Sequence, residues 1–120
     1  MRTTALAVSL PWHLWEELDE DNLVNGLRNR FEVYVNHEDS DFPFKLFSDD
    51  KFRVDRGKAI GVDIADFRER GGILSFSLVL TLTLRRVAPP KHGSSKKIKT
   101  RTVKLRIDRE SGGVEAIICD

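Results

Sequence analysis

The feature that most constrains this chain is a stretch of strict alternation between residues 72 and 87. Leucine or phenylalanine occupies every even position from Leu74 to Leu84, whereas serine, threonine, valine and arginine occupy the odd positions. A period of two is the repeat of a β-strand, in which successive side chains point to opposite faces of a sheet. At ~3.3 Å per residue the strand would span roughly 50 Å, whereas most strands have about 5–6 residues. We therefore expect it to bend, to carry a bulge or to project beyond its sheet.

The chain returns from this strand through a polar loop and a second alternating segment. Residues 88–97 contain two prolines and a Gly-Ser-Ser run, which suit a loop, and residues 99–109 alternate again. We predict an antiparallel register in which the numbers of opposed residues sum to 185. This register sets Leu82 against Val103, Leu80 against Leu105, Leu78 against Ile107 and, on the other face, Thr83 against Thr102. A slip of one residue would place the leucines against lysine and arginine, so the register should be well defined.

The same register predicts a change of character along the hairpin. Toward the loop Leu84 would face Arg101 and Arg86 would face Lys99, so the apolar row ends where the basic cluster starts. The base of the hairpin is therefore expected to be core and its tip to be solvated on both faces. Residues 111–113, Ser-Gly-Gly, predict a tight turn, and residues 114–119 a last strand.

The remaining elements are predicted from the hydrophobic period and from turn residues. Strand-like alternation is found at 4–10, 28–36, 42–46, 52–54 and 60–64. A helix is expected from about residue 11 to 25, because Pro11 suits a first turn and four apolar residues share one side: Trp12, Leu14, Trp15 and Leu18. Asp66 and Glu69 have the spacing of a capping box, which predicts a single helical turn before Gly71-Gly72.

These elements predict one α+β domain covering residues 1–120. One main N-terminal helix would pack on a twisted antiparallel sheet or partial barrel of about six to eight strands, with a long C-terminal β-hairpin. A chain of 120 residues fits one domain, and 32% charged and 40% hydrophobic residues are ordinary globular composition. Residues 85–101 are expected to project as a basic hairpin tip.

Charge is distributed unevenly along the chain, although the net charge is only +1. Residues 85–109 hold ten basic side chains and one acidic side chain, whereas residues 1–84 carry a net charge of −5 and residues 110–120 of −3. Nine of the basic residues form the candidate site for nucleic acid or another polyanion: Arg85, Arg86, Lys91, Lys96, Lys97, Lys99, Arg101, Lys104 and Arg106. Two-stranded β-ribbons fit the major groove of DNA, and lysine and arginine gain affinity for phosphates by releasing counterions. The lack of aromatic residues between Arg85 and Arg109 favours backbone contact over base stacking.

Three other interpretations of the basic hairpin stay open. Lysines on a long hairpin can simply discourage edge-to-edge aggregation. The arm could instead dock on an acidic protein surface, as a self-assembly or protein-interaction module of a regulatory, phage or viral kind. The order of strands and helix also resembles cone-shaped α+β folds that hold a small ligand or an active site in a curved sheet, but a likeness of fold does not carry function.

No pattern of catalytic or metal-binding residues stands out. His13, His37 and His92 lie in different segments, and the acidic loop 37–41 lacks the glycine and the closing glutamate of an EF-hand. The sequence contains neither a G-x-G-x-x-G nor a G-x-S-x-G motif. Cys119 is the only cysteine, which leaves no pair for a disulfide or a C-x-x-C site, and we interpret it as a small core residue. We therefore expect a non-enzymatic binding protein without a cofactor.

The expected location follows from what the sequence lacks. The apolar run Ala5–Val8 is too short for a signal peptide, and no stretch approaches the ~18 apolar residues of a membrane span. We expect a cytoplasmic protein with no membrane partner, with nucleic acid or an acidic protein surface as its partner, and with self-association as an open alternative.

Overall fold

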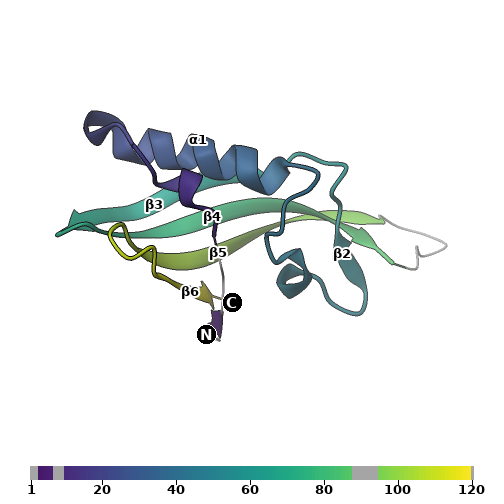
Figure 1. The fold of residues 1–120 in the computed structure, drawn as a ribbon. Coiled ribbons are helices and arrows are strands. Elements are labelled where there is room, and N and C mark those ends of the chain that lie inside the picture. The colour runs from purple at the N-terminus through teal and green to yellow at the C-terminus, as the bar shows by residue number, and fades with distance from the viewer. Residues whose placement is uncertain (1–2, 7–9, 88–94, 120) are drawn as a thin grey trace.

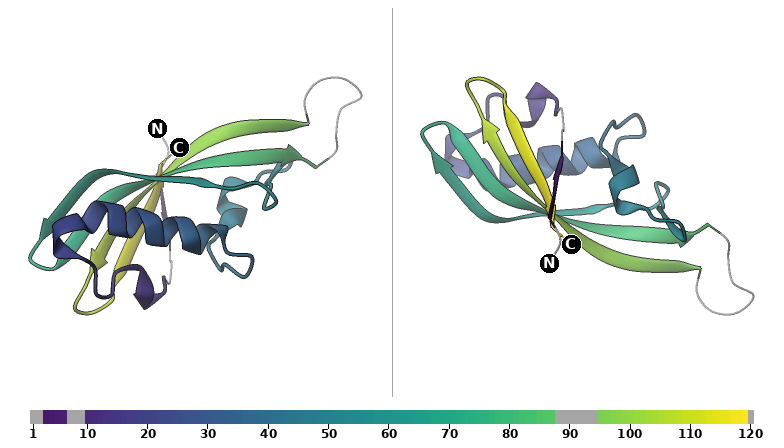
Figure 2. Two further views of the ribbon diagram at one scale, coloured as in Figure 1. Left: turned by 90° about the horizontal axis from the view of Figure 1, so that it is seen from above. Right: turned by 90° about the horizontal axis from the view of Figure 1, so that it is seen from below.

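The computed structural model describes residues 3–6, 10–87 and 95–119, which build one α-helix on a curled antiparallel sheet of six strands (Figures 1 and 2). The helix α1 spans Leu23–Asn36, and three short 3₁₀ helices are η1 (Trp12–Leu14), η2 (Glu20–Asn22) and η3 (Phe44–Phe47). The strands are β1 (Thr3–Leu6), β2 (Phe52–Val54), β3 (Gly61–Arg70), β4 (Ile73–Arg86), β5 (Lys96–Asp108) and β6 (Val114–Cys119). The predicted α+β fold class, with a main helix on a twisted antiparallel sheet and a long hairpin, is confirmed.

The sheet is organised around β4, the long alternating strand of the sequence. The strand order is β1-β6-β5-β4, and the other edge of β4 is shared by β3 at the base of the hairpin and β2 toward its tip. The β4–β5 pair is the long hairpin, and it extends past the helix in both views of Figure 2. β6 pairs with β5 only from Thr102 to Ile107, so the distal part of β5 has β4 as its only described neighbour.

The two faces of β4 differ along its whole length. All even-numbered side chains from Leu74 to Leu84 are buried on the inner face, the face that carries the helix, whereas Ser77 alone is buried on the outer face. Leu84 is only 2% exposed, so the prediction of a hairpin solvated on both faces from Leu84 onward is wrong. The reason is that the segment 42–60 adds Phe42, Phe47 and Ile60 to the same core. The tip itself, residues 88–94, lies outside the described residues.

The predicted register of the hairpin is also wrong, by four residues. Opposed residues sum to 181, so Leu78, Phe76 and Leu74 face Val103, Leu105 and Ile107. A shift by an even number keeps every leucine on the inner face, so the hydrophobic pattern fits both registers equally well. The predicted register placed the apolar residues of β5 opposite Leu78, Leu80 and Leu82. In the structure Leu80, Leu82 and Leu84 instead face Arg101, Lys99 and Lys97.

The predicted strand over 28–36 is wrong, because these residues form most of α1. The helix buries Leu27, Phe31, Tyr34 and Val35, which follow the helical spacing, and leaves Val33 exposed. Alternation of Phe31, Val33 and Val35 fits a strand when the segment is considered without Leu27. Packing against the sheet favours the helix, since the Phe31 ring lies edge-on to the Phe76 ring of β4 with centroids 5.8 Å apart.

The predicted helix over 11–25 is wrong as a regular helix. Residues 12–14 and 20–22 form 3₁₀ turns, and Glu17 between them has a positive φ of 50°. A continuous helix would set Glu16 beside Glu20 and Glu17 beside Asp21 at i,i+4, where like charges destabilise it. Of the four apolar side chains predicted to share one side, Leu14, Trp15 and Leu18 are buried, whereas Trp12 is 58% exposed.

Two smaller elements differ from the prediction as well. Residues 44–47 form η3 instead of part of a strand over 42–46. Residues 66–69 belong to β3 instead of a helical turn, because Gly71 and Gly72, both with positive φ, close a two-residue hairpin with Arg70 opposite Ile73. The alternation that predicted a strand over 60–64 continues to Arg70 through a β-bulge between Ala65 and Arg68.

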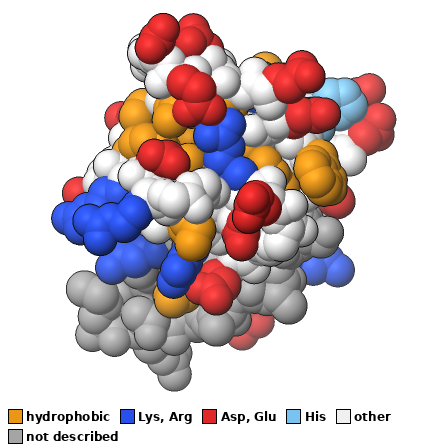
Figure 3. All heavy atoms as spheres, turned by 60° about the vertical axis from the view of Figure 1, so that its left-hand side comes forward, with side chains coloured by type: hydrophobic (Ala, Val, Ile, Leu, Met, Phe, Trp, Pro, Cys, Tyr) orange, Lys and Arg blue, Asp and Glu red, His pale blue; other side chains and the backbone are white. Residues whose placement is uncertain are grey.

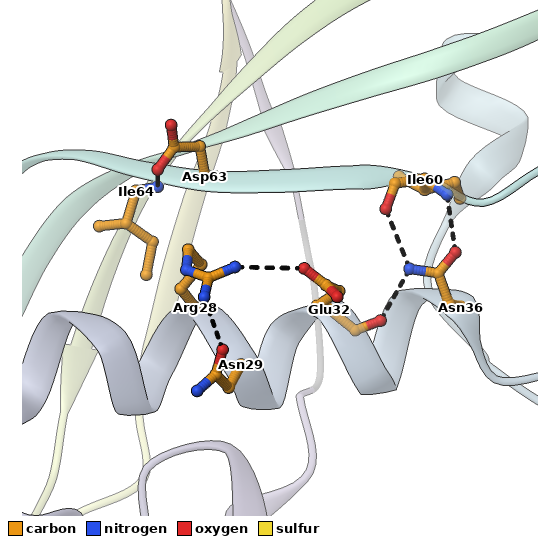
Figure 4. Close-up of polar contacts among 7 residues, drawn as sticks. All are labelled: Arg28, Asn29, Glu32, Asn36, Ile60, Asp63 and Ile64. Atoms are coloured by element: carbon orange, nitrogen blue, oxygen red, sulfur yellow. Dashed lines mark hydrogen bonds and ion pairs between the residues drawn. The ribbon is translucent and has the colours of Figure 1, made fainter.

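The C-terminal end of α1 is tied to the start of β3 by one side chain (Figure 4). Asn36 Oδ1 accepts from the Ile60 N–H at 2.7 Å, and Asn36 Nδ2 donates to the Ile60 carbonyl oxygen at 3.0 Å. This pair satisfies both backbone groups of a residue that is itself buried. It fixes where the helix crosses the sheet.

We expect Asn36→Ala to lower the free energy of unfolding by about 1 kcal/mol, because both backbone groups of Ile60 lose their partner. The exposed Asn29, which bonds only Arg28 on the same helix, offers the matched control, and Asn29→Ala should cost less than about 0.5 kcal/mol. Urea unfolding of the two variants measures the difference, and equal losses would contradict the tethering role.

The register can be tested with engineered disulfides in a Cys119→Ser background. Thr81 and Thr100 are directly opposed in the structure, so Thr81→Cys with Thr100→Cys should form a disulfide under mild oxidation. Thr83→Cys with Thr102→Cys, the pair required by a sum of 185, should remain reduced. Thiol counting and non-reducing mass spectrometry separate the two, and the reverse result would refute the observed register.

Candidate functional site

The nine predicted site residues do not form one surface. Because neighbours on a strand point to opposite faces, the eight that the structure describes divide by position. The outer face, opposite the helix, carries Arg85, Lys96, Lys104 and Arg106, and the inner face carries Arg86, Lys97, Lys99 and Arg101. Lys91 lies outside the described residues.

The inner cations cover apolar side chains beyond the end of the helix. The Lys97 Nζ lies 3.9 Å from the centroid of the Phe52 ring, and the Arg86 guanidinium lies 5.5 Å from the same ring. Lys99 and Arg101 stand opposite the fully buried Leu82 and Leu80. Long basic side chains can lay their methylene stems on apolar surface while their charges stay in water, so Arg86 and Lys97 have a structural role at Phe52.

The outer face of β4 and β5 is a continuous polar strip, which we call the polar lane. The last outward pair of these strands, Ile73 and Asp108, lies beyond the lane at its proximal end. The lane consists of the twelve other outward side chains: Ser75, Ser77, Val79, Thr81, Thr83 and Arg85 of β4, and Lys96, Ile98, Thr100, Thr102, Lys104 and Arg106 of β5. None of these is a carboxylate, and the sequence has no Asp or Glu from residue 71 to residue 107. Ten residues along β4 correspond to roughly 33 Å of strand. The lane thus combines hydroxyl groups and cations over a length that suits an extended ligand.

Charged residues of neighbouring segments border the lane. Arg53 of β2 lies beside Arg85 at the distal end, and Asp63 of β3 lies beside Val79 near the middle. Asp55, which follows β2, makes an ion pair with Lys96 at 3.4 Å. The hydrogen bond from the Gly57 N–H lowers the pKa of Asp55 most, and Lys96 lowers it further. This carboxylate is therefore ionised at neutral pH.

An excess of acidic side chains lies in another part of the molecule. Residues 10–42, which hold η1, η2 and α1, contain nine Asp or Glu and two Arg. Figure 3 shows several acidic side chains at the top of the molecule and others lower down beside Lys and Arg side chains. The acidic excess of residues 10–42 thus lies in the helical segments, although single carboxylates such as Asp55 and Asp63 lie beside the basic strands.

Sequence reasoning missed the basic residues that neighbouring strands place on the outer face, Arg53 of β2 and Arg68 and Arg70 of β3. The position of Arg68 depends on the β-bulge. Without the bulge, Arg68 would fall opposite Leu74 and point inward; with it, Arg68 falls opposite Ser75 on the outer face, and Phe67 points inward against Phe76. The extra residue of the bulge lies between Ala65 and Arg68, where Asp66 has a positive φ of 54°. The signal that could have found it is the pair of apolar residues Ile64 and Phe67, whose odd spacing breaks a period of two.

The side chains suited to catalysis or metal binding do not converge. Among the described residues no three His, Cys, Asp or Glu side chains are placed to hold a metal ion. His13 and His37 lie on either side of a shallow depression of about 390 Å³ beside Tyr34. The Tyr34 hydroxyl donates to Asp41, and burial, followed by that carboxylate, raises the pKa of Tyr34 above its ordinary range, so the phenol stays protonated. This contact anchors the loop after α1 and offers no base or nucleophile.

The comparisons with known proteins give no family assignment. The chain matches no family model, no curated protein and no solved structure. Within the described part of the chain, α1 is too short and too polar to cross a membrane, and no other helix is longer.

The structural role of the inner cations can be measured at Lys97 and Phe52. We expect a double-mutant cycle of Lys97→Met and Phe52→Leu to give a coupling free energy of about 0.5–1 kcal/mol, because methionine keeps the apolar stem and removes the charge above the ring. Urea denaturation of the four proteins supplies the cycle. A coupling near zero would show that the Lys97 charge contributes nothing through the ring.

Proposed function

We propose that this protein binds nucleic acid, and that the polar lane is the surface that contacts the phosphate backbone. The observation that carries the proposal is the composition of the lane: four cations and six hydroxyl side chains among its twelve positions, without a carboxylate. Arg, Lys, Ser and Thr are the side chains that commonly contact phosphate oxygens. An exposed sheet face that served only solubility would be expected to mix both signs of charge.

The mode of binding follows from the same side chains. The lane has no aromatic residue on which a base could stack, and its two apolar members, Val79 and Ile98, are aliphatic. Contacts to the backbone carry little sequence information, whereas their affinity falls steeply with salt through counterion release. We therefore expect salt-sensitive binding with weak sequence preference.

Head-to-tail self-association is a second candidate, and the separation of charge favours it. The described distal segments 44–60 and 85–101 hold eleven basic and three acidic side chains, whereas residues 10–42 have a net charge of −7. Opposite patches at different places on one surface can dock between copies and form open chains. This candidate predicts concentration-dependent oligomers at low salt, whereas nucleic-acid binding predicts a monomer that binds oligonucleotides.

We expect Arg85→Gln with Lys104→Gln to weaken the binding of a fluorescent 20-nucleotide DNA or RNA by about tenfold at low salt, because two phosphate contacts are lost. The slope of log K against log salt should fall in magnitude by about 1.4–1.8, the value for two phosphates on single-stranded or duplex nucleic acid. Fluorescence anisotropy across a salt series, with single-stranded and duplex probes, measures both quantities.

The matched control removes two charges from the inner face of the same hairpin. Lys99→Gln with Arg101→Gln has the same net charge as the outer double variant, and its affinity should stay within about threefold of the parent protein. Asp55→Asn, which frees Lys96 from its ion pair, should strengthen binding. If both double variants lost affinity equally, net charge alone would explain the effect, without a role for the outer face. If the parent protein bound none of the probes, the proposal would be refuted.

A further inference from the structure

The proximal end of the polar lane is hollowed. A groove of about 410 Å³ lies on the outer face between the β3 bulge and β6. Its floor and walls include three cations and two hydroxyl side chains, Arg68, Lys104, Arg106, Ser75 and Ser77, together with Asp66, Glu115 and Ile117. In the groove, basic side chains of β3 and β5 meet around two serines of β4.

The strand register brings these donors together. Arg68, Ser75 and Arg106 are direct neighbours across β3, β4 and β5, and Ser77 stands beside Lys104 in the next row. The bulge is required, because it is what turns Arg68 to the outer face. A non-glycine residue at positive φ, Asp66, is retained at this position, and strained backbone of this kind clusters at ligand sites.

The three cations of the groove outnumber its two carboxylates and form no ion pair with them. Among the described residues, no ion pair or hydrogen bond shorter than 4 Å joins the side chain of Arg68, Lys104 or Arg106 to a carboxylate. Glu115 is the cross-strand neighbour of Arg106, and Arg106 contributes weakly to the lowered pKa of Asp108, whose main cause is the N–H of Glu110. An anion in the groove could thus accept hydrogen bonds from the guanidinium groups of Arg68 and Arg106 and from the ammonium group of Lys104.

The groove also closes the lane. Asp66 and Glu115 line its two sides, and Asp108 follows at the end of β5. Asp66 and Glu115 act on any anion in the groove, whereas Asp108 lies beyond the groove, so a phosphate backbone that continued past it would meet a further carboxylate and be repelled. The favourable occupant is therefore the end of a polyanion and not its middle.

We propose that the groove holds a terminal phosphate monoester, the group found at a phosphorylated end of a nucleic-acid strand and in free nucleotides. A monoester carries between about 1.5 and 2 negative charges at neutral pH and presents three acceptor oxygens, which suits three cations and two hydroxyl groups. A backbone diester has one charge and offers less to the same donors. The strand-end form of this inference rests on the proposed binding of nucleic acid along the lane, whereas the free-nucleotide form does not.

The experiment compares one 12-nucleotide strand with a 5′-phosphate, a 3′-phosphate or hydroxyl ends, at constant salt, by competition against a labelled probe. We expect one phosphorylated form to bind about tenfold more tightly than the hydroxyl form, since charge-assisted hydrogen bonds are the strong ones. Arg68→Gln should abolish that preference and change the affinity for the hydroxyl form by less than about twofold. Arg53→Gln, at the far end of the same face, is the charge-matched control and should keep the preference.

A parallel titration with a nucleoside 5′-monophosphate, followed by the backbone amide signals of Ser75 and Ser77, tests the groove without a strand. Strands that bind equally well with and without a terminal phosphate would overturn the strand-end inference and leave the proposed function standing. If no strand binds while the monophosphate shifts both amides in the parent and not in Arg68→Gln, the groove is supported and the proposed function falls. Failure of both ligands would overturn both.

Discussion

The pairing of β4 with β5 is the interaction on which the rest of the structure depends. Every even side chain of β4 from Leu74 to Leu84 is buried, and β5 supplies Val103, Leu105 and Ile107 opposite the first three. The same alternation that builds the core on one face leaves few apolar side chains on the other face of the two strands, namely Ile73, Val79 and Ile98. A strand pair that must be strictly two-faced thus creates both the platform for α1 and the polar lane.

The basic residues of the hairpin have different roles on its two faces. On the inner face Arg86 and Lys97 stand over Phe52, and they replace the cover that the helix gives nearer the base. On the outer face the cations lie among threonines and serines, and Asp108 at the proximal end of β5 is the one carboxylate of the two described strands. The total charge of residues 85–109 does not distinguish these roles. The residue number does, because odd and even positions on a strand lie on opposite faces of the sheet.

Much of the fold could be predicted from the sequence because β4 and residues 103–107 of β5 carry a clear period of two. The register could not be predicted, because two registers bury the same side chains. Val103 lies opposite Leu82 in the predicted register and opposite Leu78 in the structure. The helix α1 was hidden because Phe31, Val33 and Val35 fit a strand until Leu27 and the facing Phe76 are considered. The site was half predictable: the cations were found, but the bulge that turns Arg68 outward depends on pairing across the sheet.

The central claim is that nucleic acid contacts the outer face of β4 and β5. A titration of methyl-labelled protein with a 20-nucleotide strand at low salt, observed by NMR, tests it most directly. The threonine methyl signals of the lane, from Thr81, Thr83, Thr100 and Thr102, should shift, and those of the buried Leu78 and Val103 should stay in place. Shifts confined to α1 or to the inner face, or none at saturating strand, would contradict the account.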